Sequence, residues 1–104
     1  MADAEGDRFT HYVITLTRNP DREADDDLIR EHVAFLRELD RKGQLVSAGP
    51  FADGAGGMII IEAGSLPEAE RIAAADPFVA SGYERCTVRT WLLSCEDNDH
   101  MGMG

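Results

Sequence analysis

Residues 25–43, DDDLIREHVAFLRELDRKG, contain the longest periodic pattern in the chain. The apolar side chains recur at the spacing of one helix face, which predicts an amphipathic helix; they are Leu28, Phe35, Leu36 and Leu39. Three aspartates open the segment, where carboxylates favour the positive end of the helix dipole, and Gly43 is typical of a helix C-terminus. We therefore expect one long helix whose apolar face packs on the rest of the protein.

His32 lies inside this apolar stripe, four residues after Leu28 and four before Leu36. An imidazole takes up and releases protons near neutral pH, so an inward-pointing histidine is a candidate acid/base group. The alternative is a core histidine that only makes a hydrogen bond to a buried partner. Periodicity alone leaves both interpretations open.

Strand-like segments lie on both sides of this helix. Residues 8–18, RFTHYVITLTR, alternate and are rich in β-branched and aromatic residues, which predicts a strand. Residues 44–51, QLVSAGPF, and 58–63, MIIIEA, are predicted to pair as a hairpin across the glycine-rich turn between them. The final strand is predicted over residues 84–93, and His11 and His100 are expected at the surface.

A second helix is predicted from Ser65, a favourable N-cap, to Ala75. Asp76-Pro77 ends it, because proline disfavours helical geometry in the residue before it. The element order is then β-α-β-β-α-β, which predicts an α+β, ferredoxin-like fold with a four-stranded antiparallel sheet and two helices on one face. Residues 8–94 form one such domain, and residues 1–7 and 95–104 are expected to be flexible termini.

The opposite face of this sheet is predicted to be too apolar for a monomer, since it carries Val13, Trp91 and Leu93. We expect a homodimer in which two sheets pack face to face into a barrel-like core.

Composition restricts the partners and the location. The net charge is −10, with 20 acidic against 10 basic residues, and such a chain is repelled by nucleic acids and by anionic membranes. The acidic N-terminus lacks the apolar stretch of a signal peptide, and no apolar run is long enough to cross a membrane. Cys86 and Cys95 are expected on opposite faces of a strand, too poorly placed for a disulfide. A cytoplasmic protein with structural thiols is expected.

Four segments together resemble the YciI-like (YCII-related) family. They are Tyr12-Val13-Ile14, His32 followed by Phe35-Leu36, Ser47-Ala48-Gly49-Pro50-Phe51, and Asp76-Pro77-Phe78-Val79 with Gly82. The resemblance covers about residues 8–94 and rests on the order and spacing of all four segments. It implies a ferredoxin-like, dimeric α/β-barrel fold with His32 and Asp76 as the active-site pair.

The candidate substrate-binding residues are Tyr12, Ser47, Gly49, Pro50 and Phe78. Several of them also have a purely structural interpretation: Tyr12 as core, Ser47 as a sheet residue, and Gly49-Pro50 as the end of a strand. Asp76 before Pro77 is also typical of a turn that only caps the chain after a helix.

Three functions remain open from the sequence. The first is a small cofactor-independent enzyme in which His32, oriented by Asp76, performs acid/base isomerase or lyase chemistry on a small cyclic or aromatic substrate. The second is a dimeric module that binds a small ligand without turning it over, and the third is a purely structural His32–Asp76 bond. No metal is expected, because two ligands do not make a site, and no nucleotide-binding motif is present.

Overall fold

The computed structural model describes residues 9–101, and the predictions for residues 1–7 lie outside that range. The four strands are β1 (Thr10–Arg18), β2 (Leu45–Pro50), β3 (Gly56–Ile61) and β4 (Glu84–Leu92). The helices are α1 (Asp26–Arg41), α2 (Leu66–Ala74) and the short α3 (Pro77–Ala80), followed by the 3-10 turn η2 (Glu96–Asn98). This order confirms the predicted β-α-β-β-α-β chain, with one additional helical turn in α3.

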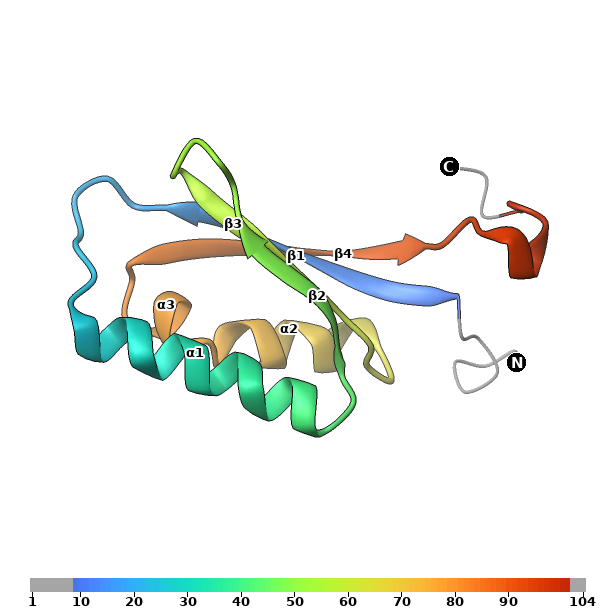
Figure 1. Cartoon of the computed structure of the whole chain (residues 1–104), viewed down its shortest axis with the longest axis horizontal. Coiled ribbons are helices and arrows are strands. Elements are labelled where there is room, and N and C mark those ends of the chain that lie inside the picture. Colours follow the sequence, from blue (N-terminus) through green and yellow to red (C-terminus); the bar gives the residue numbers. More distant parts are fainter. Residues whose placement is uncertain (1–8, 102–104) are drawn as a thin grey trace.

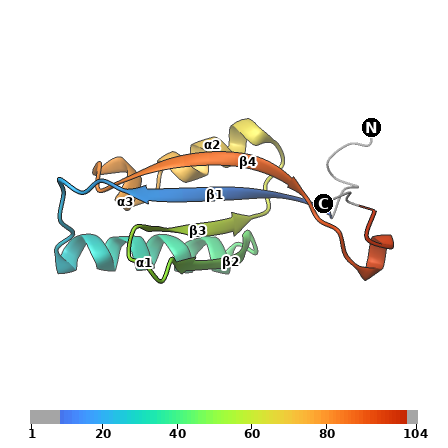
Figure 2. The same ribbon diagram turned by 90° about the horizontal axis from the view of Figure 1, so that it is seen from above.

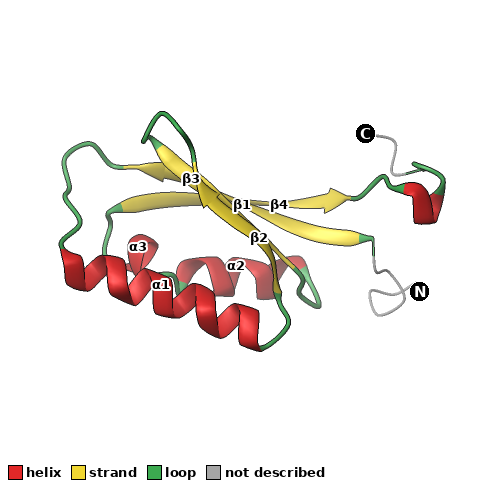
Figure 3. Ribbon diagram, viewed as in Figure 1, coloured by secondary structure: helices red, strands yellow, loops and turns green. Residues whose placement is uncertain are grey.

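The strands form one antiparallel sheet in the order β2-β3-β1-β4. The helices α1, α2 and α3 all lie on the same side of this sheet (Figures 1 and 3). Seen from above, α1 runs along the β2–β3 side and α2 along β4 (Figure 2). The fold is therefore α+β and ferredoxin-like, as predicted.

The core lies between the sheet and the helices. Alternation along β1 sends Tyr12, Ile14 and Leu16 to this side, where they are buried together with Ile59 and Ile61 of β3. Leu39 of α1 and two small residues of α2, Ala69 and Ala73, complete the buried cluster. Small residues in α2 let that helix approach the sheet closely.

The helix boundaries follow from local chemistry. Asp25 caps α1, since its carboxylate accepts a hydrogen bond from the backbone N–H of Leu28 at 2.8 Å. The α1 C-terminus is followed by Gly43 with φ +77°, a left-handed conformation that glycine adopts without strain. Asp76 is extended, as the proline after it requires, and α2 ends before it.

The segment after Asp76 contains a helix that the sequence analysis did not predict. Pro77 starts the short helix α3, because proline is well tolerated at the first helical position and Asp76 acts as the N-cap. Residues 95–101 also have local structure, with the side chain of Asn98 donating a hydrogen bond to the carbonyl oxygen of Leu93 at 2.8 Å.

The face of the sheet opposite the helices has no covering element among the described residues. Its apolar side chains include Val13, Met58, Ile60 and Trp91, and the Trp91 side chain is 43% exposed. His11 also lies on this face, but it is only 8% exposed, which corrects the expectation of a surface residue. The reason is that β1 is a central strand and Trp91 lies directly across from His11 on β4.

Cys86 and Cys95 are both free thiols, as expected. No helix among residues 9–101 is long and apolar enough to span a membrane.

Candidate functional site

His32 projects from the buried side of α1 and forms a hydrogen bond with Asp76. Its Nδ1 atom is 2.8 Å from Oδ1 of Asp76, and the imidazole is only 15% exposed. Because an ionised carboxylate only accepts hydrogen bonds, Nδ1 carries the proton in this contact. In this tautomer the remaining ring nitrogen, Nε2, is the one with a lone pair that can accept a proton.

Asp76 is held in place by the chain itself. It lies at the N-cap of α3, where Oδ1 also accepts a hydrogen bond from the backbone N–H of Phe78 at 2.9 Å. The residue is 1% exposed, and its Oδ2 atom has no hydrogen-bond partner among the described residues. Asp76 is therefore both the N-cap of α3 and the hydrogen-bond partner of His32.

Phe78 fixes the plane of the imidazole. The two rings are stacked, with their centroids 3.9 Å apart and an interplanar angle of 6°. The ring of Tyr83 packs against Phe78 at 4.9 Å in a tilted arrangement. His32 is thus restrained at one edge by Asp76 and on one face by Phe78, which leaves little freedom for the ring to rotate.

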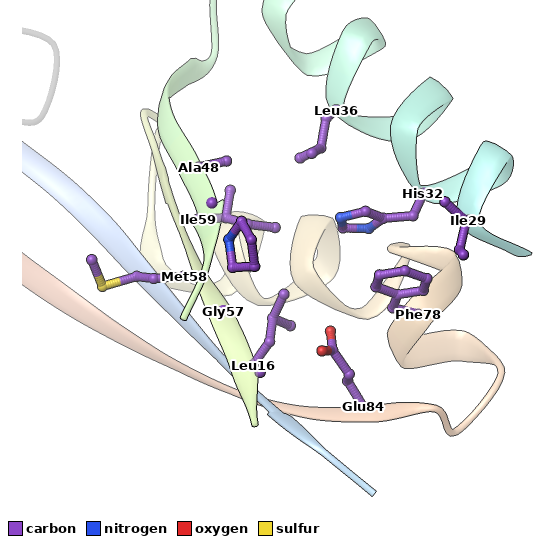
Figure 4. Close-up of a pocket in the computed structure, with 13 residues that line it drawn as sticks. Leu16, Ile29, His32, Leu36, Ala48, Gly57, Met58, Ile59, Phe78 and Glu84 are labelled. Carbon is purple, nitrogen blue, oxygen red and sulfur yellow. The ribbon is translucent and has the colours of Figure 1, made fainter. Parts of the chain in front are cut away.

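His32 opens onto a pocket of about 370 Å³ between α1, α3 and the sheet (Figure 4). This volume is at the lower end of the range for small-molecule sites, about 300–1,000 Å³. Most of its walls are apolar, and their side chains come from Leu16, Ile29, Leu36, Ile59 and Phe78. The ionisable side chains in the lining are those of His32 and Glu84.

One wall of the pocket is made of backbone. Gly49, Gly56 and Gly57 line it, where the β2–β3 hairpin lies against β1. A Cβ atom on Gly57 would lie 2.7 Å from the carbonyl oxygen of Gly49. At Gly56, where φ is +141°, a Cβ would lie 1.9 Å from the carbonyl oxygen of Leu16. Only glycine fits at Gly56 and Gly57, so the strands approach closely there and expose peptide groups to the pocket.

Glu84 was not predicted as a site residue. It is the first residue of β4, is 7% exposed, and has an Oε1 atom without a hydrogen-bond partner in the described part of the chain. Burial raises the pKa of its carboxyl group, the negative charge of Asp76 raises it further, and His32 and Arg18 act in the opposite direction. The sequence feature that could have identified it is strand alternation, since Glu84, Cys86 and Val88 are two residues apart and lie on the helix-facing side of β4.

The structure brings together some of the predicted site residues and separates others. Gly49, Pro50 and Phe78 line the pocket with His32, and Asp76 lies behind the imidazole. Tyr12 is a core residue, 5% exposed, and does not line the pocket. Ser47 lies in a second depression of about 250 Å³ that it shares with Met58 and Ile60 of the opposite sheet face.

No group of three His, Cys, Asp or Glu side chains among residues 9–101 is arranged to hold a metal ion.

Comparison with known proteins gives a family and a fold. The family model of the YCII-related domain matches residues 10–92. An uncharacterized protein of Bacillus subtilis (strain 168), YjpA, is 47% identical over 68 residues, which are 62% of this chain and 80% of that protein.

Among solved structures, the chain is similar to 5-chloro-2-hydroxyhydroquinone dehydrochlorinase (TftG) of Burkholderia phenoliruptrix AC1100 in complex with 2,5-dihydroxybenzoquinone. The TM-score is 0.57 at 24% sequence identity, over 78% of this chain and 92% of that chain. At this identity the likeness establishes the shared fold.

Proposed function

The chain belongs to the YCII-related family, and we propose that it is a small cofactor-independent enzyme of the isomerase or lyase type. His32 is its general acid/base and Asp76 orients it. The substrate is a small cyclic or aromatic compound that carries a carbonyl or hydroxyl group.

The observation that carries this proposal is the 2.8 Å contact between Nδ1 of His32 and Oδ1 of Asp76. The contact favours one tautomer, in which Nε2 has a free lone pair on a ring that lines the pocket. After Nε2 takes a proton, the carboxylate stabilises the resulting imidazolium. A buried carboxylate that caps a helix keeps its position during this cycle, because the backbone N–H of Phe78 also holds it.

The chemistry follows from these two groups. Nε2 removes a proton from a carbon next to a carbonyl group, and the electron pair of the C–H bond forms an enolate. If the substrate has a β,γ double bond, the imidazolium then returns the proton at the γ carbon, which is isomerisation; if it has a leaving group on the β carbon, the enolate expels that group, which is elimination. TftG, which shares the fold, is a 5-chloro-2-hydroxyhydroquinone dehydrochlorinase. By analogy of fold, elimination from an oxygenated ring is a reaction that a His–Asp pair could catalyse here.

The size and lining of the pocket support a ring substrate. About 370 Å³ accommodates a single substituted ring, and the apolar walls match its faces. Phe78 contributes an aromatic ring to the pocket lining, and one face of this ring is stacked on the imidazole of His32.

The active form of the proposed enzyme is a homodimer through the open sheet face. Cross-strand pairs put Ile60 beside Val13 and Trp91 beside His11 on this face. Trp91 and Met58 are exposed there at 43% and 37%, and an apolar surface of this kind in a protein of this size favours a protein partner. A second copy of the same sheet offers a matching surface.

Two measurements test the enzyme proposal. Long-range ¹⁵N NMR should show neutral His32 protonated at Nδ1 in the wild type. Turnover should be assayed on a panel of halogenated and unhalogenated hydroxy-substituted cyclic ketones and hydroquinones. His32→Ala should lower turnover of any active compound by 10²–10⁴-fold, the usual contribution of a general base. The matched control is His100→Ala, at an exposed histidine outside the pocket.

Each outcome has a distinct meaning. Equal turnover in His32→Ala and the wild type would exclude His32 as the acid/base group. Tight binding of panel compounds with no turnover of any of them would favour the non-enzymatic ligand-binding module instead.

A further inference from the structure

Glu84 is an acidic side chain in the pocket that the proposed reaction does not yet use. Glu84 is only 7% exposed and lines the same pocket as His32. Its Oε1 atom is buried and has no hydrogen-bond partner among residues 9–101. Figure 4 shows its carboxyl group directed into the pocket from β4, below Phe78. A buried carboxyl group without a partner is costly unless a ligand satisfies it.

The groups around Glu84 do not neutralise its charge. Asp76 contributes a second negative charge from the α3 N-terminus, and Cys86 is the next inward-facing side chain along β4. Arg18 lies across from Glu84 on β1, but its guanidinium interacts with Glu23 at 3.6 Å and with the carbonyl oxygen of Arg22 at 3.2 Å. His32 carries a positive charge only when it is protonated, and its Nδ1 is already bonded to Asp76.

Burial without an ion-pair partner favours the protonated carboxylic acid, although the charges of Arg18 and of protonated His32 act against it. The pKa of Glu84 is accordingly raised, with burial as the largest cause. In this form Glu84 is a hydrogen-bond donor and a proton donor inside an apolar pocket.

We propose that Glu84 is the second proton-transfer group of the pocket, which protonates an oxygen atom of the substrate while His32 takes a proton from carbon. This inference rests on the proposed acid/base function and deepens it, because it divides the two proton transfers between two residues.

The step balances for the enolisation of a ring ketone. The C–H bond next to the carbonyl breaks and its proton goes to Nε2 of His32. The C–H electron pair forms the C=C bond, and the carbonyl π pair takes the proton from Glu84. The products are an enol, an imidazolium and a carboxylate. In a ring ketone with a β,γ double bond this enol is a dienol, so the proton of His32 returns to the γ carbon and the enol O–H proton returns to Glu84, which completes an isomerisation to the conjugated ketone and restores both residues.

The same arrangement defines the charge of the ligand. No Arg or Lys is present among the residues that line the pocket. A carboxylate or phosphate ligand would have to enter without a cationic partner, close to Asp76 and Glu84. The ligand class is therefore an uncharged ring that bears a carbonyl or hydroxyl oxygen.

The protonation state can be measured without turnover. In protein labelled with ¹³C at the glutamate side-chain carboxyl, the resonance missing from Glu84→Gln identifies Glu84. Its titration midpoint should lie above that of the other glutamates. Glu70→Gln, at an exposed position on α2, is the matched control. If Glu84→Gln does not fold, the wild-type spectrum still decides, because a set of glutamates that all titrate in the ordinary range overturns the proposal.

Binding of two matched probes tests the role of Glu84 toward a ligand. Acetophenone is an uncharged ring ketone that only accepts hydrogen bonds, and benzoate is a carboxylate of similar size. Acetophenone affinity should fall at least tenfold as pH rises through the Glu84 midpoint in the wild type, because the carboxylate can no longer donate. Glu84→Gln should not show this fall, since the amide donates at every pH. Benzoate should bind at least tenfold more weakly than acetophenone at neutral pH.

The outcomes separate this inference from the proposed function. Identical pH dependence of acetophenone binding in the wild type and Glu84→Gln would overturn the role of Glu84, even for an active enzyme. If no panel compound turns over but the two proteins differ as described, the enzyme proposal and the proton transfer by Glu84 both fail, while Glu84 stands as a hydrogen-bond donor to ligands. For an active substrate, Glu84→Gln should lower turnover by 10²–10⁴-fold with little change in affinity.

Discussion

Truncation of Asp76 tests the geometry on which the site depends. Asp76→Ala removes two hydrogen bonds that end on the same oxygen, one from Phe78 N–H and one from His32. Loss of an N-cap costs about 1 kcal/mol, and loss of a bond involving a charged group costs about 1.5–3 kcal/mol. We therefore expect Asp76→Ala to lower the free energy of unfolding by about 2.5–4 kcal/mol.

A matched control isolates the part that belongs to His32. Asp25 caps α1 in the same way, with a 2.8 Å bond to the Leu28 N–H, but it is exposed and has no histidine partner. Asp25→Ala should cost only about 1 kcal/mol, the cap alone. The excess cost of Asp76→Ala over Asp25→Ala estimates the contribution of the His32–Asp76 bond.

The assay is equilibrium urea denaturation at pH 7, followed by circular dichroism at one fixed protein concentration, since association changes apparent stability. Addition of His32→Ala completes a double-mutant cycle, which should give a coupling energy of about 1–3 kcal/mol. If the two aspartate variants cost the same and the coupling energy is below about 0.5 kcal/mol, the His32–Asp76 bond contributes nothing and the reasoning is wrong.

Three further substitutions test other features. Gly56→Ala should lower the free energy of unfolding by about 1–3 kcal/mol in urea denaturation, because the added Cβ would lie 1.9 Å from a backbone oxygen. The control is Gly49→Ala, where the added Cβ has no atom within 4 Å and should cost under about 0.5 kcal/mol. Equal costs would contradict the close packing of the hairpin. The pKa of Glu84 is raised in the folded protein, so its protonation stabilises the fold at low pH and this stabilisation is lost as pH rises through the folded pKa. The free energy of unfolding of Glu84→Gln, relative to that of the wild type, should therefore increase as pH rises. If the difference between their urea midpoints does not change between pH 4 and 8, the raised pKa of Glu84 is contradicted. Trp91→Asp, on the open sheet face, should shift the protein from dimer to monomer in light scattering after size-exclusion chromatography, and an unchanged dimer would exclude this face as the interface.

The fold was predictable because its local signals agree with one another. The apolar spacing from Leu28 to Leu39 indicated the long helix, and the alternation from Tyr12 to Leu16 indicated a central strand. The short α3 was not predicted, because Asp76-Pro77 ends one helix and also satisfies the requirements for starting another. The burial of His11 was missed because strand parity gives the face of a side chain and not the size of its neighbours.

The site was predictable only where single residues are distinctive. His32 stands out as a polar residue in an apolar stripe, and the family resemblance supplied Asp76 as its partner. Tyr12 shares the helix-facing side of β1 with Leu16, yet only Leu16 reaches the pocket, and sequence contains no measure of that distance. Glu84 was missed although parity places it on the face of Cys86 and Val88, because parity at the first residue of a strand does not tell whether a helix covers the side chain.

The wall of glycine backbone has a consequence for how this pocket can diversify. Side chains cannot be added at Gly56 or Gly57 without moving a neighbouring strand. Mutation therefore has little access to that side of the ligand, and changes in substrate preference have to arise on the facing wall, at Ile29 and Leu36 of α1. These two residues are the positions at which a directed-evolution library would alter selectivity while leaving the proton-transfer groups and the sheet intact.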